Sequence, residues 1–182
     1  MGFVPDKESN YKVRKVVGEV GRIFSDLSIP VRWIKPESFH ITLYYLGENL
    51  SVFQRLVLKK KIARLKFKKF SVSLSNVKVG ISRKYKELIY IDIEDGGEEL
   101  RGLLLEVRKQ FRAKDASVFV PHLTIGRISK DLSKEEYRNV VKDISNISDK
   151  LEVKEIRFDI EEMHLIESKD GNYSFKMKFE AS

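Results

Sequence analysis

Two of the three histidines lie in copies of one short pattern whose residue types suit acid–base chemistry. The copies read FHITL over residues 39–43 and PHLTI over residues 121–125. Each is apolar apart from the His and Thr and has β-branched and aromatic neighbours, which predicts two strands. Successive strand side chains point to opposite faces, so His40 shares a face with Thr42 and His122 shares one with Thr124. One face of each strand is therefore expected to be core, and the other to carry chemistry.

The repetition extends to the element that follows each motif. Ser51 precedes Gln54, and Ser133 precedes Glu136, at the spacing of a capping box where a helix begins. In both copies the capping Ser comes nine positions after the motif Thr. A single His-x-Thr is typical of an ordinary hydrogen-bonded strand, whereas its duplication with a matching helix favours a functional pair. Each half of the chain is predicted to run strand, turn, helix.

A pair of histidines can supply both the acid and the base of a reaction near neutral pH, because an unperturbed imidazole titrates at about 6.5. Each well-placed group contributes roughly 10²–10⁴ in rate. The hydroxyls of Thr42 and Thr124 are suited to holding the non-bridging oxygens of a phosphate as charge builds there. We expect no metal and no cofactor, because neither motif has an acidic residue at ligand spacing. His164 has no Thr partner, and we assign it a structural or surface role.

Composition limits the classes of protein that this chain can represent. Its 182 residues are 42% hydrophobic, enough for one domain over residues 1–182 with a substantial core. It has no cysteine, which excludes disulfides, thiolate zinc sites and a cysteine nucleophile. No apolar run could span a membrane and no signal-peptide core opens the sequence, so we expect a cytoplasmic protein. The net charge of +8 suits a polyanionic partner such as RNA but does not prove one, and the alternative explanation is a solvated surface.

Helices that interleave with hairpin-connected strands predict an α+β fold. We expect two pseudo-symmetric lobes, each an antiparallel sheet with helices on its outer face, enclosing a central cleft where the motif strands meet. The long strand over residues 70–81 is expected to bulge at Ser75-Asn76. The predicted helices cover residues 9–27 and 100–111 and begin at Ser51 and Ser133; the chain is expected to end in a hairpin that turns at residues 169–172.

These motifs resemble those of the 2H (two-histidine) phosphoesterase superfamily, specifically the RNA 2′,3′-cyclic phosphodiesterases once described as 2′-5′ RNA ligases. The surroundings WIKPESF (33–39), YLGE (45–48) and GR (126–127) are also similar to that family. The resemblance implies a bilobal fold and metal-independent hydrolysis of a terminal 2′,3′-cyclic phosphate to a 2′-phosphate, with weak ligation in reverse. It implies that His40 protonates the departing ribose oxygen and that His122 activates water.

Two further residues are candidates for substrate contact. Tyr44 shares the His40 face by strand parity, and Arg127 belongs to the family-like surroundings of the second motif. The sequence also departs from the family at two places. Residues 1–5 replace a longer first strand, which we expect to weaken one sheet edge, and residues 82–87 lack the usual Phe-Pro near the substrate.

Three functions remain open at this point. The first is a phosphodiesterase acting on RNA with a 2′,3′-cyclic phosphate end or on a small cyclic nucleotide. The second is an RNA- or nucleotide-binding module that uses the same cleft without turnover, and the third is a 2′-5′ RNA ligase that joins tRNA halves. For each we expect a monomer with no obligate protein partner and no membrane association.

Overall fold

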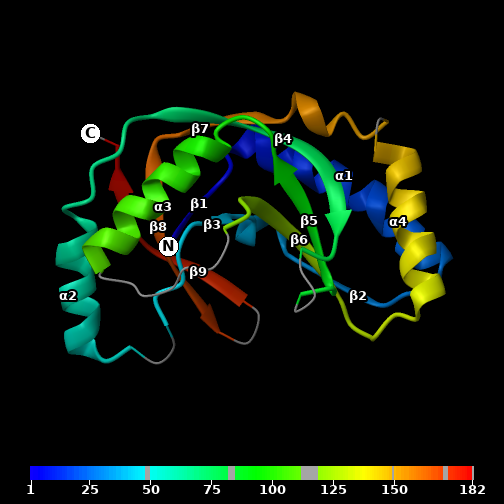
Figure 1. The fold of residues 1–182 in the computed structure, drawn as a ribbon, viewed down its shortest axis with the longest axis horizontal. Helices are drawn as coiled ribbons and strands as arrows, with labels where there is room; N and C mark the ends of the chain where they lie inside the picture. Colours follow the sequence, from blue (N-terminus) through cyan, green and yellow to red (C-terminus); the bar gives the residue numbers. More distant parts are fainter. Residues whose placement is uncertain (48–49, 82–84, 112–118, 149, 170–171, 182) are drawn as a thin grey trace.

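The computed structural model describes residues 1–47, 50–81, 85–111, 119–148, 150–169 and 172–181 (Figure 1). The loop predicted near residue 82 and the C-terminal turn fall partly outside these ranges. The elements run in the order β1 (Gly2–Phe3), α1 (Lys7–Asp26), β2 (Val31–Trp33), η1 (Pro36–Ser38), β3 (Ile41–Thr42), α2 (Val52–Ile62), β4 (Phe70–Val79), β5 (Leu88–Ile93), α3 (Gly97–Phe111), β6 (His122–Ile128), α4 (Lys134–Ser148), η2 (Val153–Glu155), β7 (Arg157–Ile160), β8 (Glu162–Lys169) and β9 (Asn172–Glu180), where η marks a 3₁₀ helix.

The strands of both halves join in one hydrogen-bonded path. Its order is β7-β4-β5-β6-β3-β1-β8-β9, and β2 pairs with β6 beside β3. Every pairing recorded among the described strands is antiparallel. The predicted α+β class is confirmed, and the motif strands β3 and β6 are neighbours at the point where the two halves of the sheet meet.

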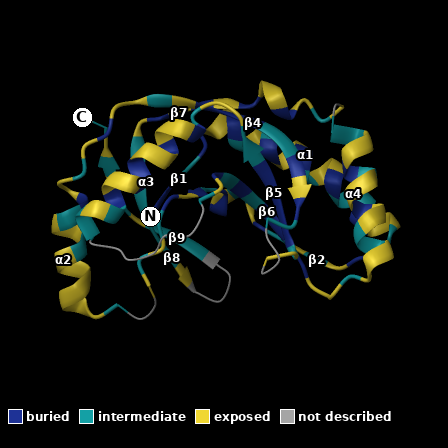
Figure 2. Ribbon diagram, viewed as in Figure 1, coloured by how far each residue is buried: buried dark blue, intermediate teal, exposed yellow. Residues whose placement is uncertain are grey.

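One hydrophobic core lies on the sheet face opposite the motif histidines. The inward side chains of the motif strands, Ile41, Leu123 and Ile125, are fully buried. Three helices cover this face with apolar residues, namely Val13, Val16, Val20 and Phe24 of α1, Leu100, Leu104 and Val107 of α3, and Val140 and Ile144 of α4. Figure 2 shows this pattern as a buried interior beneath helices with exposed outer faces. The core therefore fixes the two strands that carry the chemistry.

Both predicted capping boxes are present. At α2, the Ser51 hydroxyl accepts a hydrogen bond from the Gln54 amide, and the Gln54 side chain accepts one from the Ser51 amide. At α4, Ser133 and Glu136 exchange the same pair of bonds. Lys130 and the Ser133 amide lower the pKa of Glu136 to about 2. The matching helix starts after the two motifs are therefore a feature of the fold.

Helix α2 leaves most of its apolar residues in solvent (Figure 2). Val52 and Phe53 are 76% and 75% exposed, and Ile62 is the residue of the helix that the core buries. Arg55 joins α2 to β8 through an ion pair of 3.2 Å with Glu167. Because only its C-terminal end packs inward, α2 lies at the periphery of the described structure.

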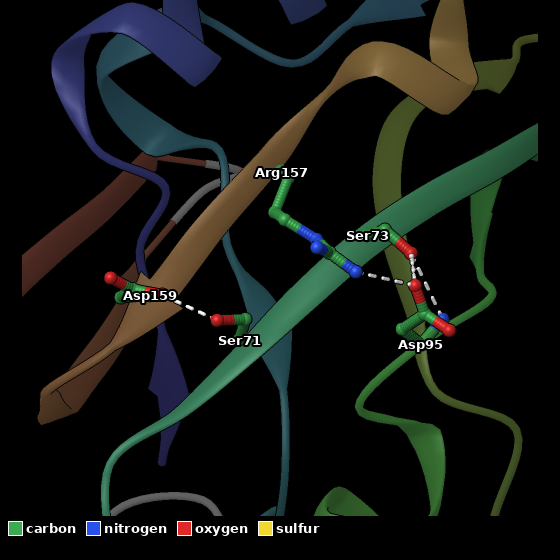
Figure 3. A network of polar contacts seen from close by, with 5 residues as sticks. All are labelled: Ser71, Ser73, Asp95, Arg157 and Asp159. Atoms are coloured by element: carbon green, nitrogen blue, oxygen red, sulfur yellow. Dashed lines mark hydrogen bonds and ion pairs between the residues drawn. The ribbon is translucent and has the colours of Figure 1, made fainter.

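A polar network fastens β7 to β4 at one edge of the sheet (Figure 3). Asp95 follows β5 and accepts hydrogen bonds from the Ser73 hydroxyl at 2.8 Å and from Arg157 at 2.8 Å. These two bonds hold the pKa of Asp95 below its usual range. The Ser71 hydroxyl donates to Asp159 at 2.6 Å. Exposed contacts of this kind contribute little each, and together they link β7 to β4 and to the end of β5.

Strand β1 lies inside the sheet, which corrects the expectation that residues 1–5 form a weak edge. It pairs with β3 on one side and β8 on the other, and Gly2 is the Cα partner of both Thr42 and His164. A Cβ on Gly2 would collide with the Ile41 carbonyl oxygen, so the close approach requires glycine. The short strand is stable there because Phe3 is fully buried.

None of the helices in the described ranges is long and apolar enough to cross a bilayer.

Candidate active site

The register between β3 and β6 brings the two motifs together. Ile41 pairs with Leu123, so one further step in each direction of this antiparallel register sets His40 opposite Thr124 and Thr42 opposite His122. Residues opposite each other lie about 4.5–5.5 Å apart at their Cα atoms. The four side chains share the sheet face opposite the core, which we call the motif face. Each threonine therefore stands beside the histidine of the other motif.

Both histidines are oriented in the same way by the backbone. His40 Nδ1 lies 2.8 Å from the Ser38 carbonyl oxygen, and His122 Nδ1 lies 2.7 Å from the Val120 carbonyl oxygen. A carbonyl oxygen can only accept, so each Nδ1 carries the proton and donates it. Nε2 of each ring is then a base when the ring is neutral and an acid when it is charged. The repeated motif thus delivers two rings in one tautomer.

Burial lowers the pKa of His40 and of His122, because the surrounding protein disfavours the charged imidazolium. The hydrogen bonds to Ser38 and Val120 act in the opposite direction. The charge of His122 lowers the pKa of His40 further. Protonation of His122 therefore opposes protonation of His40.

Strand β5 supplies two neighbours of His122 that the sequence did not identify. Asp92 is the Cα partner of His122 and raises its pKa, and Asp92 itself forms an ion pair with Lys78. The Tyr90 ring packs edge-on against His122 with 5.4 Å between centroids and is 6% exposed. The alternation of side chains along residues 88–93 could have identified both neighbours. Ile89 and Ile91 are core residues, so Tyr90 and Asp92 share the other face of the strand.

A bulge in β6 brings Arg127 to the motif face. Tyr90 pairs with Thr124 but Ile89 pairs with Gly126, so β6 has one extra residue at this point. A Cβ on Gly126 would lie 2.9 Å from the Trp33 ring, which shows that Gly126 faces the core side. Arg127 then returns to the side of His122, and its charge lowers the pKa of that ring. Arg127 also forms an ion pair of 3.0 Å with Glu87.

Tyr44 and His164 have recorded ring contacts with residues outside the two motifs. Tyr44 packs on Phe111 at the end of α3, with 6.0 Å between ring centroids, and its role as a substrate contact stays a prediction. His164 lies on the motif face because its Cα partner Gly2 also pairs with Thr42. Its ring is 5.6 Å from the Phe175 ring, and burial lowers its pKa. Its assignment to a structural or surface role also stays a prediction.

The described residues contain no group of three or more His, Asp or Glu side chains placed to hold a metal ion. Around the two motifs, the described structure thus brings together two imidazoles, two hydroxyls and the Arg127 guanidinium, with Asp92 beside them. This set can move protons at two points and donate hydrogen bonds to an anion between them.

Two histidines and two threonines on adjacent antiparallel strands are the arrangement expected of a two-histidine phosphoesterase. The family model described as the 2′-5′ RNA ligase superfamily matches residues 34–172, and the chain belongs to this family. The predicted family is therefore confirmed.

Two curated relatives carry the same name. "RNA 2′,3′-cyclic phosphodiesterase" of Aquifex aeolicus is 29% identical over 135 residues, which cover 70% of this chain and 69% of the relative. The protein of that name from Archaeoglobus fulgidus is 24% identical over 155 residues, 84% of each chain.

Solved structures show the same fold. Apo LigT of E. coli matches with a TM-score of 0.68 at 16% identity and covers 100% of this chain and 95% of its own. TT0787 of Thermus thermophilus matches with a TM-score of 0.59 at 17% identity, and the match covers 98% of this chain and 94% of TT0787. At these identities the likeness concerns the fold alone.

Proposed function

We propose that this protein hydrolyses RNA-terminal 2′,3′-cyclic phosphates to 2′-phosphates with its two motif histidines as acid and base. The observation that carries the proposal is the matched orientation of the two rings, each with Nδ1 bonded to a backbone carbonyl and Nε2 left for proton transfer. The names of the curated relatives support the same reaction. LigT of E. coli, which shares the fold, has been crystallised with 3′-AMP.

The reaction needs one proton taken and one given. Nε2 of neutral His122 accepts a proton from water as the water oxygen bonds to phosphorus. The bond between phosphorus and the ribose O3′ breaks, and protonated His40 gives its Nε2 proton to that oxygen. The products are a 2′-phosphate and a free 3′-hydroxyl, and the next turnover requires the two rings to exchange protonation states.

The threonines and Arg127 have a separate task in this proposal. Negative charge builds on the two non-bridging oxygens when the phosphorus becomes five-coordinate, and the hydroxyls of Thr42 and Thr124 donate to them. His40 lies opposite Thr124 and Thr42 lies opposite His122, so imidazole and hydroxyl groups alternate around the site. A phosphate between the two imidazoles therefore has a hydroxyl donor on each side of the line from the attacking oxygen to the leaving oxygen. Arg127 supplies positive charge on the same face.

All four motif side chains lie on paired strands of one chain, so we infer that a monomer is sufficient for activity. No step of the proposal requires a metal ion, because the proton transfers and the charge stabilisation are assigned to the described side chains.

The test is to incubate the protein with a short RNA ending in a 2′,3′-cyclic phosphate and to identify the products. A 2′-phosphate end supports the proposal, whereas a 3′-phosphate end would reverse which ribose oxygen leaves. A second RNA with a 5′-hydroxyl end, present in the same reaction, tests the ligation named by the family description. Binding of the cyclic end without any product would favour the binding module instead.

A further inference from the structure

The C-terminal hairpin extends the motif face beyond His40. In β8 and β9, Met163 is buried in the core and its Cα partner Phe179 packs against the core, so their neighbours His164 and Lys178 face the other way. A register shift after Leu165 then makes Ile166 the partner of Phe175, and Ser168 the partner of Tyr173.

Two contacts show that this alternation places Tyr173 on the motif face. A Cβ on Gly2, the partner of Thr42, would lie 3.1 Å from Ile166 Cδ1. The Tyr173 ring lies against the His40 ring, with 4.7 Å between centroids and 57° between planes. An aromatic side chain of the edge strand β9 therefore borders the first catalytic candidate.

Resting on the function proposed above, we propose that Tyr173 is the residue on which the base of the terminal nucleotide stacks. The departing O3′ belongs to the ribose of that nucleotide, so a ribose that receives a proton from His40 must lie beside the His40 ring. Its base extends from the same sugar, and Tyr173 is the aromatic residue whose ring lies against the His40 ring. Stacking on an aromatic ring accepts any nucleobase, because every base has a π face.

On the His122 side, the aromatic ring that packs against the motif histidine differs in its exposure. Tyr90 packs against His122, but it is 6% exposed and offers no ring face to a ligand. Tyr173 is half-buried at the edge strand and retains accessible surface. Of these two rings, Tyr173 is therefore the one available to a nucleobase, which favours the His40 side for the nucleoside.

Tyr173 could instead serve only to hold the His40 ring. That ring is already fixed through its Nδ1 hydrogen bond to Ser38, so the structure does not require a second support. The two roles differ in one measurable respect. A stacking residue matters only when the ligand has a base, whereas a support for His40 matters for every substrate.

The experiment compares ligands with and without a base. Calorimetry gives Kd for adenosine 2′-phosphate and for ribose 2-phosphate, and turnover is measured with adenosine 2′,3′-cyclic phosphate and with methyl riboside 2,3-cyclic phosphate. Tyr173→Leu should weaken binding of the adenosine ligand about tenfold and change that of the sugar phosphate less than twofold. Tyr173→Phe, which keeps the ring, should bind both as the parent does.

Tyr11→Leu is the matched control, because Tyr11 is 57% exposed on the outer side of α1. It should change neither ligand. Equal loss for both ligands in Tyr173→Leu would assign Tyr173 to support of His40, and no loss for either would remove it from the site; both outcomes overturn the inference. If the parent turns over neither cyclic phosphate, the proposed function fails while the two binding constants still decide the role of Tyr173.

Discussion

Ile41 of β3 and Leu123 of β6 are directly opposed, and both side chains are fully buried. This core pair sets the register of the two motif strands. On the other face of the sheet, the same register sets each motif histidine opposite the threonine of the other motif. The hydrophobic core thus determines which hydroxyl accompanies which imidazole, and a slip of one residue would send the catalytic candidates into the core.

The first prediction concerns the hydroxyls. Thr42→Val and Thr124→Val keep the β-branched shape that suits a strand but remove the hydrogen-bond donor. Each should lower kcat on the order of 10², the usual effect of losing one donor to a developing oxyanion, and change KM much less. Steady-state kinetics with a 2′,3′-cyclic nucleotide measures both constants. Thr→Ser at the same positions is the control and should keep most activity, whereas a rise in KM with kcat intact would assign the hydroxyls to ground-state binding.

The second prediction concerns the two motif histidines. His40→Ala or His122→Ala should each cost at least ~10² in rate, because each removes one of two required proton transfers. The double variant should be far less impaired than the product of the single effects, since the two rings act as one unit. Rates are compared after circular dichroism has shown that each variant is folded. Near-normal turnover by either folded single variant would end the two-histidine mechanism.

Local features of the fold could be predicted from the sequence because a few adjacent residues determine them. The capping boxes at Ser51 and Ser133 are present, and β4 shifts register between Leu74 and Val77, where the bulge was expected. Strand parity likewise placed His40 with Thr42. Each of these depends on spacing within a few residues.

Long-range features could not be predicted in the same way. No local pattern reveals that Gly2 passes between Thr42 and His164, because strand pairing joins residues far apart in sequence. Arg127 reaches the motif face through the bulge in β6, where Gly126 lies close to the Trp33 ring. Strict alternation along β6 would have turned Arg127 toward the core, and the Tyr173 contact with His40 has no signal in either motif.

A third prediction concerns metal ions. Activity should survive exhaustive chelation with EDTA, because the two motifs offer two acid–base groups and two hydroxyls but the described residues contain no cluster of three or more His, Asp or Glu ligands. The measurement is kcat before and after chelation, with bound metal quantified by mass spectrometry. Loss of turnover that a divalent ion restores would show that the mechanism lacks an essential component.

The fourth prediction is the pH dependence of the reaction. Activity requires one neutral and one protonated histidine, so the rate should fall at low pH as the base becomes protonated and at high pH as the acid loses its proton. Burial lowers the pKa of both rings, which places the maximum of kcat/KM below about pH 6.5. A bound phosphate favours the imidazolium, so the kcat profile should lie at higher pH than that of kcat/KM.

A substitution at Asp92 shows which histidine causes the fall in rate at low pH (the acidic limb) and which causes the fall at high pH (the alkaline limb). Its charge raises the pKa of His122, so Asp92→Asn should lower that pKa further. If His122 is the base, the acidic limb moves to lower pH, by less than about one unit, and the alkaline limb moves little. Movement of the alkaline limb alone would make His122 the acid and reverse the two roles, and a kcat/KM that rises steadily through pH 8 would exclude a paired-histidine mechanism. Profiles from pH 4 to 9 at constant ionic strength, for the parent and Asp92→Asn with the same cyclic nucleotide, decide between these outcomes.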